Sequence, residues 1–349
     1  MKAVRIIEPD KPLELNQVEI SDPTGTQVLI KVLSTGVCHS DLHLWEGGYD
    51  TGDGFMKVTD RGVKFPVTPG HEVVGNIEKI GESVKDVQIG DTVLVYPWIG
   101  CGICPTCQKG DTNLCETPKS LGVFQDGGYA EKVIVPDYKF LANIGDVNPD
   151  SASSLACSGL TAYTAIKKAL VNNPESILIV GAGGLGLMGV QLASHMTQCK
   201  IICADLDDVK LNTAKELGAT HVINTKESDS SQKIMSICNE KGVDSIVDFV
   251  NAPPTVKLDL SVIRKRGNII LVGLFGGSVE LPLVSVPLKS ITIQGAYTGN
   301  YKDMVELIEL AKKGVINPIV SKHYTLDEAT DALDDLKNRK ILGRAVINP

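Results

Sequence analysis

Two different rhythms of hydrophobic and polar residues divide this chain. Up to about residue 140, short apolar or alternating runs such as 28–32, 91–95 and 132–135 are interrupted by Gly, Pro and Asp. This pattern predicts strands in a compact, mostly β domain. From about residue 153, apolar runs of five or six residues alternate with helical stretches. That alternation is typical of a parallel sheet covered by helices, so we expect two domains of different class.

The second rhythm predicts six strands, at residues 176–180, 200–204, 221–223, 244–249, 268–272 and 290–294. Six such strands with intervening helices suffice for a doubly wound α/β sheet of the Rossmann type, which binds dinucleotides. Beyond residue 300 the pattern predicts an amphipathic helix through Met304, Leu307, Ile308 and Ala311, a second helix at 326–336 and a last strand at 344–347.

Length and composition narrow the class of protein and its partners. A chain of 349 residues exceeds what one hydrophobic core normally serves, and no apolar run approaches the ~20 residues of a membrane span. The N-terminus reaches Glu8 without the apolar core of a secretory signal, so we expect a cytoplasmic protein. A net charge of -8 argues against nucleic acid and anionic lipid as partners. A small-molecule substrate is favoured.

The nine cysteines of a chain without an export signal indicate metal ligation or buried thiols before disulfides. Cys101, Cys104, Cys107 and Cys115 are separated by two, two and seven residues. Four thiolates at such spacing close a tetrahedron and predict a structural zinc site. Iron-sulfur clusters and nucleic-acid-binding zinc ribbons use similar spacings, but the acidic charge of the chain argues against both.

A second metal site of another character is indicated by Cys38 and His71, which are mixed sulfur and nitrogen ligands far apart in the sequence. A catalytic zinc ion needs three protein ligands and an open position for the substrate oxygen. Spacing alone leaves the third ligand open among Glu72, His39, His43 and a distant cysteine. The fold has to gather such ligands.

A glycine-rich turn follows the strand at 176–180. Residues 181–186 read Gly-Ala-Gly-Gly-Leu-Gly and run into a helical stretch, which is the order that dinucleotide binding requires. Gly181 allows the tight turn and Gly183 lets the backbone approach the pyrophosphate. Gly186 permits close packing of helix and strand.

An acidic residue ends the next strand. Asp205 lies 24 residues beyond Gly181, where a carboxylate can accept the ribose hydroxyls and repel a 2′-phosphate. NAD is therefore favoured over NADP, although Lys210 is near enough to leave NADP open. Asp205 could also cap the helix that begins near Asp207.

Together these motifs resemble the zinc-dependent medium-chain alcohol dehydrogenases, most of all archaeal and bacterial members that use NAD. The resemblance covers essentially the whole chain. It implies a GroES-like catalytic domain of residues 1–152 and 295–349, with a structural zinc lobe at about 98–118, and a Rossmann domain of residues 153–294. It also implies two zinc ions per subunit, interconversion of alcohols with aldehydes or ketones, and a homotetramer, with a dimer as the alternative.

The resemblance assigns roles to single residues. Cys157 is implied as the third ligand of the catalytic zinc, Glu72 as an acidic neighbour of the metal, and Ser40 with His43 as the path for the proton. Asp41 fits a carboxylate that orients the ligating histidine. The remaining implied positions are the cofactor residues His39, Gly184, Leu185, Val250, Val272, Leu274 and Ala296 and the substrate-pocket residues Trp98, Leu121 and Phe124.

Three alternatives stay open at this point. Lys57, Arg61 and Lys64 lie on the loop 46–65 and could bind the carboxylate of succinic or malonic semialdehyde, although such charges are more often solvated. A polyol or threonine dehydrogenase would differ only in pocket residues. A non-catalytic regulator that binds NAD and zinc is the alternative of another class, and the retained set of proposed catalytic residues speaks against it.

Overall fold

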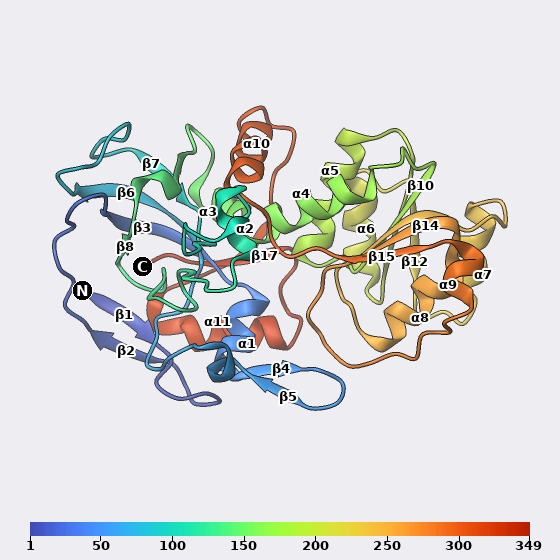
Figure 1. The fold of residues 1–349 in the computed structure, drawn as a ribbon, viewed down its shortest axis with the longest axis horizontal. Coiled ribbons are helices and arrows are strands. Elements are labelled where there is room, and N and C mark those ends of the chain that lie inside the picture. Colours follow the sequence, from blue (N-terminus) through green and yellow to red (C-terminus); the bar gives the residue numbers. More distant parts are fainter. The chain divides into compact units, whose positions relative to one another are not determined.

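The computed structural model describes residues 1–349 and divides the chain into two compact units (Figure 1). The first unit comprises Met1–Gly48, Lys57–Leu160 and Gly299–Pro349. The second comprises Tyr49–Met56 and Thr161–Thr298. The chain therefore begins and ends in the first unit, and one long segment forms most of the second.

A seven-stranded sheet forms the centre of the first unit. Its order is β16-β17-β3-β6-β7-β9, with β8 also paired to β3, and only β16 and β17 run parallel to each other. The strands are β3 (Val28–Gly36), β6 (Glu72–Ile80), β7 (Thr92–Val95), β8 (Lys132–Val135), β9 (Leu141–Asn143), β16 (Val320–Tyr324) and β17 (Arg344–Ile347). The run expected at 28–32 continues to Gly36, because the polar residues Ser34 and Thr35 are also fully buried.

Short elements surround this sheet. The strands are β1 (Lys2–Arg5) and β2 (Glu14–Gln17), and the α-helices are α1 (His39–Trp45), α2 (Pro105–Gln108), α3 (Pro149–Ser153), α10 (Tyr301–Lys312) and α11 (Ala329–Lys337). The 3₁₀ helices are η1 (Val58–Arg61), η2 (Thr112–Leu114), η3 (Tyr138–Phe140), η4 (Ser154–Ala156) and η5 (Leu326–Glu328). The helix expected at 326–336 thus begins as a 3₁₀ turn. Its α-helical part buries Ala329, Ala332, Leu333 and Leu336 on one face, as the sequence spacing predicts.

The second unit is built on a six-stranded parallel sheet of order β12-β11-β10-β13-β14-β15. These strands are β10 (Ser176–Val180), β11 (Lys200–Asp205), β12 (His221–Asn224), β13 (Val243–Asp248), β14 (Ile263–Leu271) and β15 (Thr292–Gly295). The helices are α4 (Ser158–Ala169), which starts in the first unit, α5 (Gly184–Met196), α6 (Asp208–Glu216), α7 (Ser230–Ile237), α8 (Pro253–Val262) and α9 (Ser285–Lys289). A hairpin of β4 (Gly48–Asp50) and β5 (Phe55–Lys57) completes the elements.

The expected doubly wound fold class is confirmed, and the deviations from the expected strands are local. All five residues of β10 are buried, which explains the apolar run from Ile177 to Val180. Strand β14 begins at Ile263, before the expected residue 268, and includes the cationic residues 264–266, of which Lys265 and Arg266 are exposed. Strand β15 begins two residues later than expected. Ser290 takes a left-handed conformation with φ of 51° at the end of α9.

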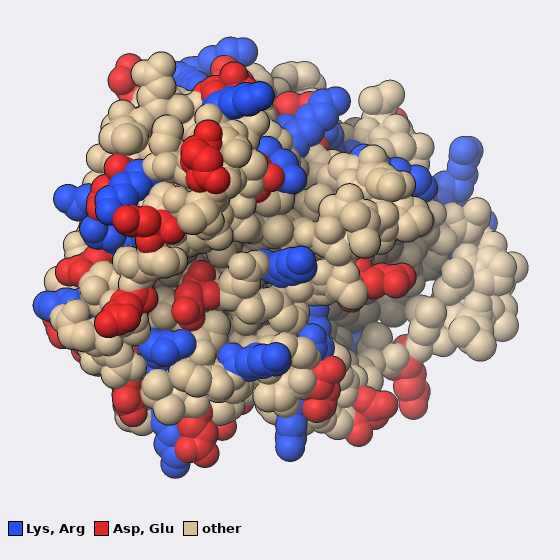
Figure 2. Space-filling view, turned by 60° about the vertical axis from the view of Figure 1, so that its left-hand side comes forward, with Lys and Arg blue, Asp and Glu red and all other residues tan.

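Charged side chains of both signs are interspersed on the molecular face shown in Figure 2, where Lys and Arg form no continuous area. The face shown therefore carries no basic patch, in agreement with the net charge of -8. No helix has both the length and the apolar character needed to cross a membrane.

Candidate active site and metal sites

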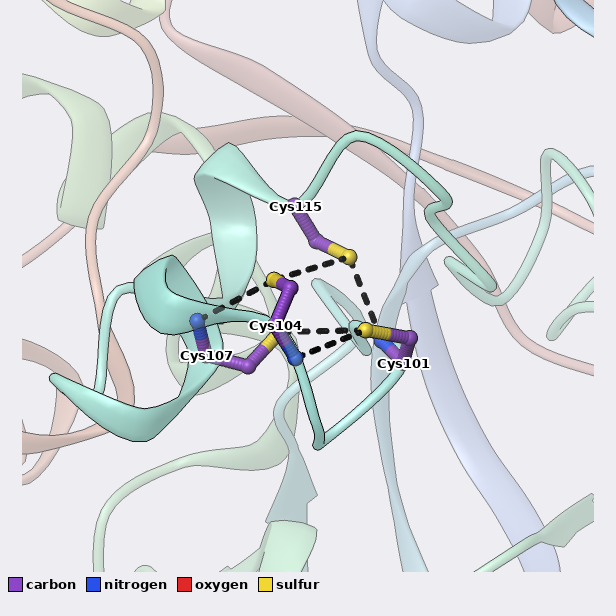
Figure 3. A group of neighbouring side chains, drawn as sticks. All are labelled: Cys101, Cys104, Cys107 and Cys115. Atoms are coloured by element: carbon purple, nitrogen blue, oxygen red, sulfur yellow. Dashed lines mark hydrogen bonds between the residues drawn. The ribbon is translucent and has the colours of Figure 1, made fainter.

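Four cysteine side chains converge within one short segment of the first unit (Figure 3). Cys104 precedes α2 and Cys107 lies in it, whereas Cys101 and Cys115 come from loops. All four sulfur atoms lie within 4.8 Å of one another, and two of the Sγ–Sγ distances are 4.0 and 3.9 Å. A tetrahedron with Zn–S bonds of about 2.3 Å has edges of about 3.8 Å. The four thiols therefore fit a four-coordinate zinc ion.

Backbone amides support these sulfur atoms. The Cys104 N–H donates to the Cys101 sulfur at 3.4 Å, and the Cys101 N–H donates to the Cys115 sulfur at 3.2 Å. Thr117 approaches Cys115 with its N–H at 3.4 Å and its hydroxyl at 3.7 Å. The backbone N–H groups of Ile103 and Cys104 lower the pKa of the Cys101 thiol to about 6. Burial raises the pKa of the Cys107 thiol to about 12, so the backbone favours the zinc-binding thiolate form at Cys101 and not at Cys107.

The cysteine segment is tied to a distant part of the chain. The Asp111 carboxylate accepts a hydrogen bond of 3.2 Å from the Asn300 side chain, which also caps α10. The buried Tyr96 hydroxyl donates to the Gly299 carbonyl at 2.8 Å and accepts from the Thr112 hydroxyl at 3.3 Å. The loop and helix that carry the four thiols therefore contact the place where the chain re-enters the first unit.

A second group of possible metal ligands is assembled from separate elements. Cys38 precedes α1, His71 lies immediately before β6, Glu72 begins β6, and Cys157 follows η4. Their ligand atoms lie within 4.8 Å of one another, and all four residues are buried. The sulfur atoms of Cys38 and Cys157 are 3.9 Å apart. Cys157, which spacing did not single out, therefore lies beside Cys38 and His71.

The ring of His71 is oriented by Asp41. Its Nδ1 lies 3.1 Å from the Asp41 carboxylate, which also accepts the N–H groups of Cys38 at 3.0 Å and Gly70 at 3.1 Å and the Tyr129 hydroxyl at 3.3 Å. The buried Nε2 of His71 has no hydrogen-bond partner. A buried ring nitrogen without a partner among thiols fits a metal ligand. Burial disfavours a charged imidazole, but Asp41 and Cys38 raise the pKa of His71 well above its ordinary value.

Glu72 is held by groups that the sequence does not single out. Its carboxylate accepts a hydrogen bond from the Ser158 N–H at 3.2 Å and another from the guanidinium of the buried Arg344. Burial raises the pKa of Glu72 to about 6 although Arg344 opposes this shift. The hydrogen bond with the Cys157 thiol and the neighbouring cations His71 and Arg344 lower the pKa of Cys38, although burial opposes this shift. The donor set therefore suits a divalent cation that takes sulfur, nitrogen and oxygen ligands.

The residues proposed for proton transfer share α1. Ser40 and His43 are three positions apart, so they lie on one face of this helix, and both are partly buried. Burial lowers the pKa of His43, and Glu46, whose carboxylate lies 4.0 Å from its Nδ1, opposes the shift only in part. His39 is the first residue of the same helix and is also partly buried.

The expected pocket residues occupy different surroundings. The Trp98 ring centre lies 5.3 Å from that of His71, and its indole N–H donates to the Ala156 carbonyl at 3.0 Å. Trp98 is therefore fixed beside the mixed metal group. Leu121 is buried in the core of the sheet, whereas Phe124 is partly exposed. The contribution of Leu121 and Phe124 to a pocket stays a prediction.

Two residues of this site are not among the candidates from the sequence. Arg344 begins the last apolar strand, and a cation in an otherwise buried run is a signal for a buried ion pair. Tyr129 gives no comparable signal. Its contact with Gly70 becomes visible only in the fold, where Gly70 has φ of 93° and a Cβ would lie 2.3 Å from the Tyr129 ring.

In the second unit, the three glycines of the turn have distinct surroundings. Gly181 has φ of 91°, and a Cβ on it would lie 2.8 Å from Val250. A Cβ on Gly186 would lie 1.7 Å from the Gly181 carbonyl oxygen, so α5 packs directly on the turn. Nothing lies within 4 Å of the corresponding position on Gly183. Gly184 and Leu185 form the N-terminus of α5, which offers backbone N–H groups to an anion.

Asp205 at the end of β11 faces the glycine turn. Its carboxylate accepts the Ala182 N–H at 2.6 Å, the Leu206 N–H at 2.7 Å and the Asp207 N–H at 3.0 Å. Asp207, and not Asp205, caps α6, because its side chain accepts the N–H groups of the first helical turn. The alternative capping role of Asp205 is therefore wrong. Lys210 lies in that first turn and is partly buried.

The expected nicotinamide residues follow three adjacent strands. Val250, Val272 and Ala296 come just after β13, β14 and β15. The Val272 N–H donates to the Asp248 carbonyl at 2.9 Å, and the Ala296 N–H donates to the Leu271 carbonyl at 3.0 Å. Leu274 is exposed. All four thus lie at the carboxyl edge of the parallel sheet, where nucleotides bind in doubly wound folds.

A doubly wound sheet with this glycine turn and acidic strand end, carried on a chain with a buried group of mixed metal ligands, defines a dehydrogenase of the metal-dependent class. The chain belongs to the zinc-binding medium-chain alcohol dehydrogenase family. Residues 24–146 match the "Alcohol dehydrogenase GroES-like domain" model, and residues 184–313 match the "Zinc-binding dehydrogenase" model.

Full-length relatives agree with this assignment. The chain is 40% identical to the NAD-dependent alcohol dehydrogenase of Saccharolobus solfataricus, with 100% of both chains covered. It is similar to the crystal structure of the alcohol dehydrogenase of Aeropyrum pernix, with a TM-score of 0.91, 34% identity and full coverage of both chains. It is also similar to the D-arabinose dehydrogenase of Sulfolobus solfataricus, with a TM-score of 0.82, 28% identity and 95% coverage of each chain.

Proposed function

We propose that this protein interconverts alcohols with aldehydes or ketones by transferring a hydride to or from NAD. The observation that carries the proposal is the buried group of Cys38, His71 and Cys157, in which His71 Nε2 has no partner. The first unit is assigned the catalytic role and the second unit the binding of NAD. Zinc supplies a Lewis acid for the substrate oxygen, and NAD supplies the hydride acceptor.

The chain's own residues contribute orientation and proton transfer. Asp41 fixes the His71 ring by its contact with Nδ1 and so directs Nε2 toward the two thiols. Trp98 is locked by its bond to Ala156 and supplies an apolar wall. The Ser40 hydroxyl takes the alcohol proton and His43 passes it on. A lowered pKa keeps the His43 imidazole neutral near pH 7, ready to accept a proton.

For the cofactor, Gly183 leaves room for the pyrophosphate, which meets the N-terminus of α5. Asp205 is held at the edge of the turn by the Ala182 N–H, where a carboxylate suits the ribose hydroxyls of NAD and repels the extra phosphate of NADP. His39 is assigned to the pyrophosphate. Val250, Val272, Leu274 and Ala296 are assigned to the nicotinamide.

The direct test follows the absorbance of the nicotinamide in zinc-loaded enzyme with NADH or NADPH. Neutral aliphatic and aromatic aldehydes, carboxylated semialdehydes and aldose sugars are offered in parallel. Rapid oxidation of NADH with neutral aldehydes supports the proposal. Oxidation of NADPH at equal efficiency would contradict the role of Asp205, and absence of turnover with every substrate would favour a non-catalytic NAD- and zinc-binding protein.

A polyol or sugar dehydrogenase is the second candidate function, and the similarity to the D-arabinose dehydrogenase is the observation that favours it. Selective turnover of sugars or polyols in the same panel would support it. Threonine is also included in the panel, because a threonine dehydrogenase is part of the same alternative. The cations Lys57, Arg61 and Lys64 are exposed, and a strong preference for semialdehydes would give them a role in binding substrate.

We assign a homotetramer to the active protein, with contacts between copies along β15, the edge strand of the sheet. Ile293 on this strand and Leu283, Val284 and Leu288 around α9 are exposed apolar residues. An edge strand with apolar neighbours can pair with the same strand of a second copy, because pairing satisfies its free backbone N–H and C=O groups. Sedimentation equilibrium tests the assignment, and a monomer would contradict it. Nine free cysteines support a reducing, cytoplasmic location.

A further inference from the structure

Two buried carboxyl groups face each other beneath the carboxyl edge of the sheet in the second unit. Asp248 ends β13 and Asp259 lies in α8, and both residues are 0% exposed. Their hydrogen-bond partners differ completely. The Asp248 carboxylate accepts the N–H groups of Val250 and Asn251 at 2.8 Å each and the Thr255 hydroxyl at 2.6 Å. Neither oxygen of Asp259 has a donor from the rest of the protein.

This asymmetry shows where a proton resides. Burying a carboxylate without hydrogen-bond donors costs free energy, and two adjacent buried carboxylates cannot both remain charged. Burial raises the pKa of Asp248, but its three donors oppose this shift and make it the better candidate for the ionised form. Asp259 has only the Asp248 carboxylate within hydrogen-bonding reach, and this partner can only accept. Asp259 is therefore the protonated member and donates to Asp248.

Burial and the neighbouring Asp248 charge raise the pKa of Asp259 well above its ordinary value. Asp248 is the one charged group that influences Asp259 from the elements packed against α8. Strands β13 and β14 and the end of α8 contribute Ile246, Val262 and Ile269 to one apolar core cluster. Lys289 of α9 donates to the carbonyls of Leu260 and Ile263 near the end of α8, and no cation pairs with the Asp259 carboxyl group.

Asp248 is hydrogen-bonded directly to the turn at residues 249–252. Asp248 holds the N–H groups of Val250 and Asn251, and Asn251 adopts φ of 56°, which is uncommon for a residue other than glycine. The Asn251 side chain donates to the Gly273 carbonyl at 2.9 Å. Gly273 is so close to the turn that a Cβ on it would lie 2.1 Å from the Val250 carbonyl oxygen.

The same turn adjoins the nucleotide site. Val250 packs against Gly181, the first glycine of the phosphate turn, and follows the central strand of the sheet at its carboxyl end. Ligands of doubly wound folds bind at this edge. A displacement of the turn by a fraction of an ångström would therefore change the walls of the cofactor site.

We propose that Asp259 is a positioning residue for the cofactor site, which stores one proton against Asp248 and thereby fixes the turn at 249–252. The inference rests on the proposed binding of NAD at this edge. Asp259 touches no cofactor. It acts through Asp248 and the backbone of Val250 and Asn251.

The test compares Asp259→Asn with Asp259→Leu in the full-length, zinc-loaded enzyme. Asparagine keeps a donor toward Asp248 and cannot ionise, whereas leucine keeps the volume and removes the donor. We expect the Kd for NADH, measured by fluorescence titration at pH 7, to stay within about twofold for Asn and to rise about five- to tenfold for Leu, as for the loss of one hydrogen bond. KM for NADH should follow Kd, and KM for the alcohol should not.

Asp244→Asn is the matched control, because Asp244 is a buried carboxylate of the same strand at its opposite end and is paired with Arg264. This change should leave NADH affinity unaltered. Equal NADH affinity in the Asn and Leu variants of Asp259, or an equal loss in Asp244→Asn, would overturn the positioning role. Failure of the wild-type enzyme to bind NADH would instead contradict the proposed function.

A second measurement tests the stored proton without a ligand. A carboxyl group whose folded pKa is raised favours the folded state fully below its unfolded pKa, and this contribution is lost as pH rises toward the folded pKa. Asp259→Asn cannot ionise, so its stability does not decrease with pH for this reason. The thermal midpoint of Asp259→Asn relative to wild type should therefore increase steadily from pH 5 to pH 8. A difference that does not change with pH would show that Asp259 carries no shifted proton.

Discussion

The two metal groups of the first unit are held by opposite means. The four thiols between Cys101 and Cys115 come from one continuous segment and are supported mainly by its own backbone N–H groups. Cys38, His71 and Cys157 come from separate elements and are supported by buried side chains, above all Asp41 and Arg344. One group is partly exposed at Cys101 and Cys104, and the other is fully enclosed.

This difference separates two ways to prepare thiolates and imidazole for a metal. Backbone donors are present wherever the segment folds, so the four-thiol group needs little from the rest of the chain. Side-chain donors and charges in a buried site interact more strongly, because little water screens them. They also depend on the complete fold. The enclosed group should therefore be more sensitive to changes in its supporting residues.

The largest effect is expected where a ligand of the enclosed group is removed. His71→Ala deletes the unpartnered Nε2 and should lower turnover by more than about 100-fold, beyond the ~10–100-fold typical of residues that only support a ligand. NADH binding should remain, because the glycine turn lies in the other unit. Steady-state kinetics and fluorescence titration measure the two quantities. Undiminished turnover would refute the assignment of the metal site.

Removing a ligand of the other group should affect stability more than chemistry. Cys104→Ala deletes one thiolate of the tetrahedron and should reduce the bound zinc from two ions to one per chain. Because structural zinc contributes to folding, we expect the apparent thermal midpoint to fall by about 5–10 °C. Turnover at 25 °C should fall less than tenfold. A loss of activity as large as that of His71→Ala would abolish the contrast between the two groups.

A supporting residue of the enclosed group comes next. Asp41→Asn replaces the carboxylate that His71 Nδ1, Cys38 N–H and Gly70 N–H share. The loss of its charge should reduce zinc affinity or turnover by about 10–100-fold. Zinc competition with a chelator and turnover under saturating zinc distinguish the two causes. An unchanged enzyme would mean that geometry alone holds His71.

The smallest effect is expected for the corresponding support of the four-thiol group. Thr117→Val removes the hydroxyl near the Cys115 sulfur but keeps the backbone N–H that donates to it. We expect a loss of stability of about 1 kcal/mol or less and a shift of the midpoint below about 3 °C. A shift as large as that of Cys104→Ala would show that side chains, and not the backbone, support this group.

The same contrast explains what the sequence could and could not predict. The four-cysteine spacing and the glycine turn are local, so their geometry follows from the order of residues within a short segment. The parallel sheet is also readable, because β10 is buried on both faces and is therefore apolar from Ile177 to Val180. Cys157 required the family resemblance, since its meeting with Cys38 joins positions 119 residues apart.

Other features depend on packing that no local pattern encodes. Arg344 and Glu72 pair across 272 positions, and neither end of this pair indicates the other. Strand β3 runs past its last apolar residue because Ser34 and Thr35 are buried by the fold and not by their own character. Asp205 and Asp207 are both candidates for the cap of α6 in the sequence, and only the positions of their carboxylates distinguish them.

The bond between Asp111 and Asn300 bears on how the chain is made. It joins residues 189 positions apart, and the bond from Tyr96 to Gly299 spans 203 positions. The ribosome delivers all four thiols long before either partner emerges, and nascent chains fold from the N-terminus. The cysteine segment can therefore take up zinc early, while its outer contacts close only after most of the protein has been synthesised.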